Sequence, residues 1–240
     1  MRSKLPIGTL INMLTVVVGS LIGVSLQQAF PENIQQIIFQ AIGLASVLIG
    51  VQMSLRVPDG YLLVLIFSMI LGGVIGELIH LDVWMQSMGD QLKAAINTED
   101  ARFTEGLVTA FILFCVGSMT IVGALDEGLQ GKRELILIKS MLDGITSIAF
   151  AATYGIGVLF SIIPMFFLQG GITVLAKWME PFFTNIIINQ ISAAGGLLII
   201  AIAIRLLGLG EVNIENLLPS LLVVALLSWL YEQFQLSYSR

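Results

Sequence analysis

Charged residues are scarce in this chain. Asp, Glu, Lys and Arg make up only 11% of its 240 residues, apolar residues make up 57%, and the mean hydropathy is +0.96. Soluble domains carry about 25% charged residues because their surfaces face water. The composition therefore excludes a soluble enzyme or a disordered chain and predicts a polytopic membrane protein. The net charge of -5 provides no basic surface for a phosphate backbone, so we expect no nucleic-acid partner.

Cysteine and histidine are rarer still. Cys115 is the single cysteine and His80 the single histidine. This content permits no internal disulfide and no Cys/His zinc cage. The sequence also lacks a phosphate loop, a serine-triad motif, an HExxH motif and a dinucleotide-binding fingerprint. We therefore expect no cofactor, no metal and no enzymatic activity.

Long apolar segments are abundant. A bilayer core of about 30 Å requires about 20 apolar residues per helix. The segments of this kind predict an all-α, polytopic transmembrane helix bundle of about eight spans, forming a single domain over residues 1–240. The predicted spans are 6–26, 33–55, 61–81, 106–125, 135–154, 157–176, 184–207 and 216–233.

Lysine and arginine are unevenly distributed between the predicted loops, and they concentrate on the cytoplasmic side of membrane proteins. With both termini in the cytoplasm, seven of them lie inside and two outside. Merging the fifth and sixth spans moves Lys177 and Arg240 outside and leaves five against four. The pattern favours eight spans. The inside residues are Arg2, Lys4, Arg56, Lys132, Arg133, Lys177 and Arg240, and the outside residues are Lys93 and Arg102.

The one long connection, residues 82–105, is predicted to be an outside loop. Apolar residues recur at near-helical spacing from Val83 to Ile96. Two alternatives remain open: a helix lying along the outer surface, or a solvated linker.

An internal similarity suggests an inverted-topology repeat. The segment from Pro31 resembles the segment from Pro181, with Gln40 aligned with Gln190. The first three spans would then match the last three. Five helices separate the starts of the two units, so the copies cross the membrane in opposite directions. The predicted parts are a first repeat at 1–81, central helices at 106–154 and a second repeat at 155–240; the alternative is chance similarity between Ile-rich helices.

Ionisable residues inside a membrane usually face a cavity, a partner or an ion pathway. Lys139 and Asp143 are four residues apart in the fifth span and therefore share one helix face. Asp143 is the candidate group for carrying a proton or binding Na⁺. Two alternatives remain for Lys139: its side chain reaches the headgroups, or it pairs with Asp143. An ion pair of Lys139 with Asp143 would in turn serve ion coupling or only helix packing.

Uncharged polar residues complete the candidate set for substrate or ion binding. Some of them lie near the glycine pairs Gly170–Gly171 and Gly195–Gly196, and the others lie in other spans. At each glycine pair the helix either unwinds or admits a neighbouring helix. The Glu127 region, after the fourth span, is interpreted as a solvated connector, with a turn that gates a cavity as the alternative. The added candidates are Gln169, Asn189, Gln190, Asn12 and Ser118.

Several segments resemble one bacterial family. TAFILFCVGSMTIVGALDEGLQGK, KSMLDGITSIAFA and SAAGGLLIIAIAIRLLGLGEVNIENLLPSLL are similar to the membrane family named domain of unknown function 554. The resemblance covers nearly the whole chain and implies a bacterial inner-membrane protein of unassigned activity, for which transport is the usual interpretation. The chain departs from the family pattern at four positions: Ser118 replaces proline, Lys132 replaces Asp, Gln190 replaces an acid, and Arg205 replaces Asn. The departure at Gln190 argues against ion coupling there, whereas Asp143 and Lys139 match the pattern.

Two functions follow as hypotheses. The first is a secondary transporter or permease for a small polar or ionic solute, with H⁺ or Na⁺ coupled through Asp143. The alternative is a membrane scaffold or sensor without transport, in which the polar groups only hold helices together. Expected partners are the lipid bilayer, an unknown small solute and, from the Gly19–Gly23 and Gly72–Gly76 spacings, a second copy of the chain in a homodimer.

Overall fold

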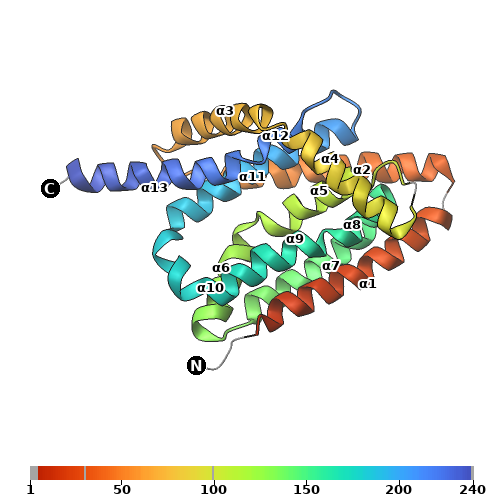
Figure 1. Ribbon diagram of the computed structural model, residues 1–240, viewed down its shortest axis with the longest axis horizontal. Coiled ribbons are helices and arrows are strands. Elements are labelled where there is room, and N and C mark those ends of the chain that lie inside the picture. The colour runs from red at the N-terminus through yellow and green to blue at the C-terminus, as the bar shows by residue number, and fades with distance from the viewer. Residues whose placement is uncertain (1–4, 30, 99, 239–240) are drawn as a thin grey trace.

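The computed structural model describes residues 5–29, 31–98 and 100–238, and every regular element in these ranges is helical (Figure 1). Short connections join helices that pack side by side. The α-helices are α1 (Ile7–Ala29), α2 (Glu32–Ser54), α3 (Leu62–Leu78), α4 (Leu81–Ile96), α5 (Phe103–Cys115), α6 (Ser118–Gln130), α7 (Glu134–Tyr154), α8 (Gly157–Phe160), α9 (Ile162–Met165), α10 (Gly171–Met179), α11 (Asn185–Leu206), α12 (Ile214–Leu217) and α13 (Ser220–Tyr238). A π-helix, η1 (Phe166–Gly170), precedes α10, and a short 3₁₀-helix, η2 (Glu180–Phe182), follows it.

The helices confirm an all-α, polytopic membrane protein. Six helical stretches are long and apolar enough to cross a bilayer, and two bent pairs raise the number to as many as eight. Many large apolar side chains face outward, as lipid contact requires. On α7, for example, Ile138, Met141 and Ile145 are all more than half exposed.

The bent pairs modify two of the predicted segments. Within residues 82–105 the structure has the helix α4, as the helical spacing of the apolar residues predicts. This helix is bent by 61° from α3 after His80, whose φ of 51° ends the preceding helix. The fourth predicted span, 106–125, is also not one helix, because α5 and α6 meet at a 61° bend around Val116 and extended Gly117.

The glycine pairs behave differently from each other. Helix α11 runs without a break through Gly195 and Gly196, so the unwinding alternative is wrong for this pair. A Cβ on Gly196 would lie 2.6 Å from the carbonyl oxygen of Gly50, which shows that this glycine admits α2. Gly170 is the last residue of the π-helix η1, and the chain then continues directly into α10, which begins at Gly171.

Close glycine contacts reveal the relative directions of the helices. Gly8 and Gly23 of α1 face Ile136 and Ala151 of α7, so these two helices run parallel. Helix α2 is antiparallel to α11, and α3 is antiparallel to the chain from α12 into α13. Eight successive crossings require these directions, because odd-numbered spans are parallel to one another and antiparallel to even-numbered spans.

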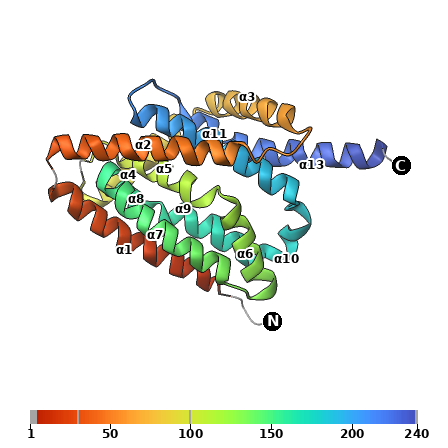
Figure 2. The same ribbon diagram turned by 180° about the vertical axis from the view of Figure 1, so that it is seen from behind.

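The beginning of α1 is the left-hand end of this helix in Figure 1 and its right-hand end in Figure 2, and the end of α13 points the same way in each view. We call this end of the molecule the terminal end, and we call the opposite end, where α4 lies, the α4 end. The side of the membrane that each end faces remains a prediction. The inverted repeat also remains a prediction, although α2 packs on α11 and α3 on α13, the helices that the repeat would make equivalent.

Candidate functional site

Helix α7 carries an ion pair inside the bundle. Lys139 Nζ lies 2.8 Å from Asp143 Oδ1 and 2.6 Å from Oδ2, and the two residues are only 5% and 6% exposed. The four-residue spacing places both side chains on one helix face, as predicted. Lys139 therefore pairs with Asp143 and does not reach toward the headgroups. Two opposite charges at this depth stabilise each other, whereas either one alone would be costly.

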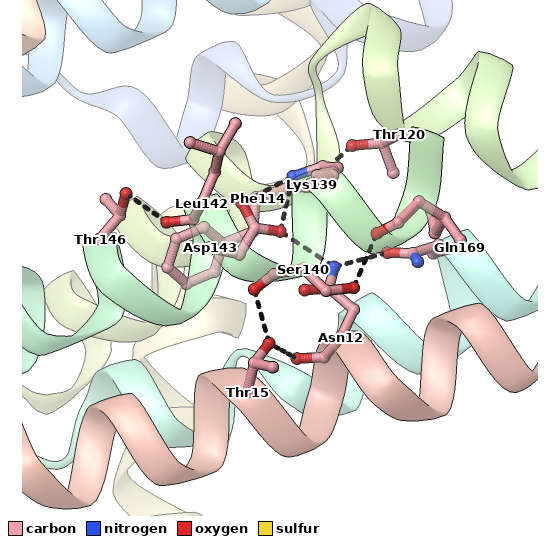
Figure 3. Close-up of polar contacts among 11 residues, drawn as sticks. Asn12, Thr15, Phe114, Thr120, Lys139, Ser140, Leu142, Asp143, Thr146 and Gln169 are labelled. Atoms are coloured by element: carbon pink, nitrogen blue, oxygen red, sulfur yellow. Dashed lines mark hydrogen bonds and ion pairs between the residues drawn. The ribbon is translucent and has the colours of Figure 1, made fainter. Parts of the chain in front are cut away.

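Helix α1 supplies the next member of the site. Asn12 Nδ2 donates to Asp143 Oδ2 at 2.9 Å and to Gln169 Oε1 at 3.1 Å. Figure 3 shows these side chains converging from α1, α7 and η1. The helices approach closely because Gly144 faces Thr15 of α1, whose hydroxyl donates to the carbonyl oxygen of Ser140 at 2.8 Å.

The π-helix η1 places Gln169 on the buried side facing α1. π-helical turns insert an extra residue into the helical register and occur frequently at functional sites. Within the part of the chain that the structure describes, three buried atoms here have no hydrogen-bond partner: Thr9 Oγ1, Asn12 Oδ1 and Gln169 Nε2. Buried polar atoms normally have partners, so the site retains the capacity to bind a further polar group.

The bend between α5 and α6 lies beside the ion pair. Cys115, the last residue of α5, interacts electrostatically with Lys139 and Asp143 and is 1% exposed. Thr120 of α6 donates its hydroxyl hydrogen to the carbonyl oxygen of Phe114 at 2.9 Å, which connects the two half-helices (Figure 3). The interrupted span thus lies against the charged residues.

The structure brings four predicted site residues together and leaves three elsewhere. The four are Asn12, Lys139, Asp143 and Gln169. Gln190 donates instead to the carbonyl oxygen of Tyr61 at 2.9 Å, on the α3–α13 side of α11. Ser118 accepts a hydrogen bond from Arg56, and Asn189 is half-buried on α11.

Glu127 is a buried charged residue that the sequence analysis assigned to a solvated connector. It is 2% exposed, and its carboxylate oxygens accept from the backbone N–H of Gly8 at 2.9 and 3.1 Å. Arg133 Nε lies 2.7 Å from the same carboxylate. A carboxylate at the first turn of α1 is stabilised by the unpaired N–H groups and the dipole of that helix. In the sequence, Arg133 is the one sign of this arrangement.

A second polar region lies at the α4 end around Arg205. Its guanidinium nitrogens lie 3.8 Å from Glu105, 3.7 Å from Glu211 and 3.5 Å from Glu215. A cavity of about 1130 Å³ opens there between α4 and the 207–213 loop. Among the residues that the structure describes, no three His, Cys, Asp or Glu side chains are grouped to hold a metal ion.

Comparison with known proteins identifies relatives over nearly the whole chain. It is 33% identical to the "Uncharacterized membrane protein YdfK" of Bacillus subtilis (strain 168) over 233 residues, covering 96% of this chain and 99% of that protein. It is 30% identical to the "Uncharacterized protein YqgA" of Escherichia coli (strain K12) over 227 residues, covering 92% and 96%. No solved structure matches the chain. The model of the family described as "Protein of unknown function (DUF554)" matches residues 7–229, and the chain therefore belongs to this family of membrane proteins.

Proposed function

We infer that this protein is a secondary carrier for a small polar or ionic solute, and that the Lys139–Asp143 pair is its ion-coupling centre. The observation that carries this proposal is a buried ion pair in one span, bonded to Asn12 and adjoining Gln169 from two other segments. Charges are retained at such depth chiefly where they serve an ion or substrate pathway.

The surroundings of the pair support the same function. Carriers commonly combine interrupted helices with polar side chains near the membrane midplane. Here α5 and α6 are interrupted around Gly117, and η1 interrupts the neighbouring span. An added Cβ at Gly117 or Gly171 would meet no atom within 4 Å among the described residues, so neither glycine is packed against a neighbouring helix.

Transport by this centre requires that Asp143 changes partners. A coupling ion that neutralised the carboxylate would weaken its attraction to Lys139, and the released ammonium would raise the energy of the existing helix arrangement. The equilibrium between two arrangements shifts by the difference in ion affinity between them. The cavity at Arg205 is the candidate solute entrance at the α4 end.

The test is electrical recording from the purified protein in liposomes adsorbed to a solid-supported membrane. Jumps in Na⁺, in pH and in a panel of amino acids, carboxylates and amines are applied, and we expect at least one to give a transient current. Asp143→Asn should abolish that current. Asp59→Asn is the matched control, because Asp59 is an exposed carboxylate before α3 that lies outside the ion-pair site and does not line the cavity at Arg205.

The alternative function is a scaffold or sensor without transport. It is favoured by the saturation of Asp143, whose two oxygens already receive hydrogen bonds from Lys139 and Asn12. In that case no tested solute or ion gives a current, and Asp143→Asn changes only the stability of the protein. A current equal in wild type and Asp143→Asn would instead remove Asp143 from the mechanism.

A further inference from the structure

Buried polar side chains connect the ion pair with the terminal end of the molecule. Asn12 and Thr9 are three residues apart on α1 and both are 0% exposed. Opposite them lie Gln169, also 0% exposed, and Thr173, whose hydroxyl donates to the Gln169 carbonyl oxygen at 3.1 Å. The side chain of Thr9 faces Gly170, since its Cγ2 would be the atom nearest to a Cβ built there, at 3.7 Å.

Glu127 lies where these side chains approach the surface. Its carboxylate binds the N–H of Gly8, the residue next to Thr9, and pairs with Arg133. The Arg133 side chain is 41% exposed and so reaches water. The buried Glu127 carboxylate therefore contacts the partly exposed Arg133 on one side. On the other side it binds the residue next to Thr9, the first polar residue of α1.

The opposite direction along α7 is mainly apolar. Between Asp143 and the α4 end lies a buried cluster that includes Val16, Phe114 and Phe150. The Phe150 and Tyr154 rings stack with centroids 5.9 Å apart. The buried hydroxyls on this side include those of Ser20, Ser147 and Thr153, and near the α4 end Tyr154 and the half-buried Glu105 line one cavity. The terminal side differs because it has a buried carboxylate, Glu127, that is hydrogen-bonded to the first turn of α1.

We propose that Asp143 exchanges its proton with water at the terminal end, through a route along α1 formed by Glu127, Thr9, Asn12 and Gln169. Thr9 Oγ1, Asn12 Oδ1 and Gln169 Nε2 are the unpartnered atoms of the described residues that face this route. Water molecules bridge such atoms when two or more polar partners surround them, and chains of water and hydroxyl groups relay protons. The proposal rests on the proposed function and deepens it, because it names the proton as the coupling ion and the terminal end as its side of access.

The proton is accounted for at each step of the exchange. A proton from the solvent enters at the Glu127 carboxylate and is relayed to Asp143, whose carboxylate becomes the neutral acid. Lys139 keeps its proton, so the site changes from a neutral pair to a single positive charge. The groups that face Asp143 are Lys139 on its own helix, Asn12 of α1, Cys115 of α5 and, through Asn12, Gln169 of η1. Glu127 faces Arg133 and the start of α1.

The experiment measures proton exchange without requiring transport. Infrared difference spectra of the reconstituted protein record the carbonyl-stretch band of a protonated carboxyl group after a pH jump. Loss of the band in Asp143→Asn assigns it to this residue. We expect Glu127→Gln to slow the appearance of the band by about tenfold or more, because it removes the proton-binding carboxylate but keeps an acceptor for Gly8.

Thr9→Val is the second variant, because it removes the hydroxyl while keeping the side-chain shape. It should also slow the appearance of the band by about tenfold. The proposal therefore stays testable if Glu127→Gln prevents folding. Thr153→Val is the matched control, a 1% exposed threonine on the other side of Asp143, and Ser20→Ala is a second one. Both should leave the rate unchanged.

Three results would overturn the proposal: no Asp143 band at any pH at which the protein stays folded, wild-type rates in both route variants, or equal slowing in the two controls. The outcome is separable from that of the proposed function. Normal currents with unaltered exchange in the variants would reject the route alone, whereas slowed exchange in a protein that gives no current would reject the carrier and retain the route.

Discussion

Asn12 and Asp143 are 131 positions apart in the sequence, yet Asn12 Nδ2 lies 2.9 Å from Asp143 Oδ2. This contact joins the first span to the fifth, and the same nitrogen extends it to Gln169 in the sixth. The helices that would have to move during transport thus share a hydrogen-bonded centre. A change in the charge of Asp143 therefore directly alters the interactions that join all three spans.

The charges of the pair should depend strongly on each other. Removing one partner of a buried pair leaves an uncompensated charge and costs about 3–5 kcal/mol, whereas apolar replacement of both is often close to neutral. We expect Lys139→Met and Asp143→Leu each to lower the stability by this amount and the double variant to recover most of it. Reversible unfolding in mixed detergent micelles measures the four proteins of this double-mutant cycle. Additive losses would show that the two side chains do not interact in the folded protein.

Asn12 should stabilise the fold through its hydrogen bonds. Asn12→Ala removes two of them and leaves Gln169 without a donor, so we expect a loss of about 1–3 kcal/mol in the free energy of unfolding. Asn189→Ala, a half-buried amide outside the site, is the control and should cost less than half as much. The thermal unfolding midpoint in detergent checks the comparison, and equal shifts would contradict the position of Asn12.

Two glycines should respond in opposite ways to the same substitution. A Cβ on Gly19 would lie 2.2 Å from the carbonyl oxygen of Gly144, so Gly19→Ala must push α1 away from α7. At Gly171 a Cβ would meet no described atom within 4 Å, and the residue is helical. Gly171→Ala should therefore be neutral or stabilise the protein by about 0.5–1 kcal/mol. Yield of monodisperse protein after detergent extraction and its melting temperature report both effects; tolerance of Gly19→Ala would refute the parallel packing of α1 on α7.

The eight-crossing topology predicts which loops share a side. In a Cys115→Ala background, single cysteines at the exposed positions 132 and 180 should react with a membrane-impermeant maleimide from the cytoplasmic side only. Cysteines at the exposed positions 90 and 211 should react from the opposite side. Labelling of inverted and right-side-out vesicles measures this accessibility. Residues 132 and 180 reacting from different sides would contradict the topology.

The hydrophobic pattern predicted the helices well because apolar length is a property of the sequence itself. The predicted 135–154 and 184–207 correspond closely to α7 and α11. The break at Val116 was missed, since neither a proline nor a charge marks it and α5 and α6 are individually too short to be recognised as spans. The bend depends on contacts with distant helices, which local sequence does not contain.

The candidate site was predictable only where its spacing is local. Lys139 and Asp143 are one helical turn apart, so sequence alone pairs them. Asn12 and Gln169 were suspected as buried polar residues, but only the packing of α1 and η1 on α7 unites them with the pair. Gln190 was grouped with them because it is equally buried and polar, yet α11 turns it toward Tyr61. Glu127 was missed because one of its partners is the backbone N–H of Gly8, a group that every residue except proline provides.

Proton movement into sealed liposomes tests the central claim most directly. Protein reconstituted in liposomes that contain a pH-sensitive dye is exposed to an outward or inward pH gradient together with the solute identified by the electrical screen. The account predicts solute-dependent proton flux in wild type and Asp59→Asn, and none in Asp143→Asn at equal protein content. Solute movement without proton flux, or undiminished proton flux in Asp143→Asn, would contradict it.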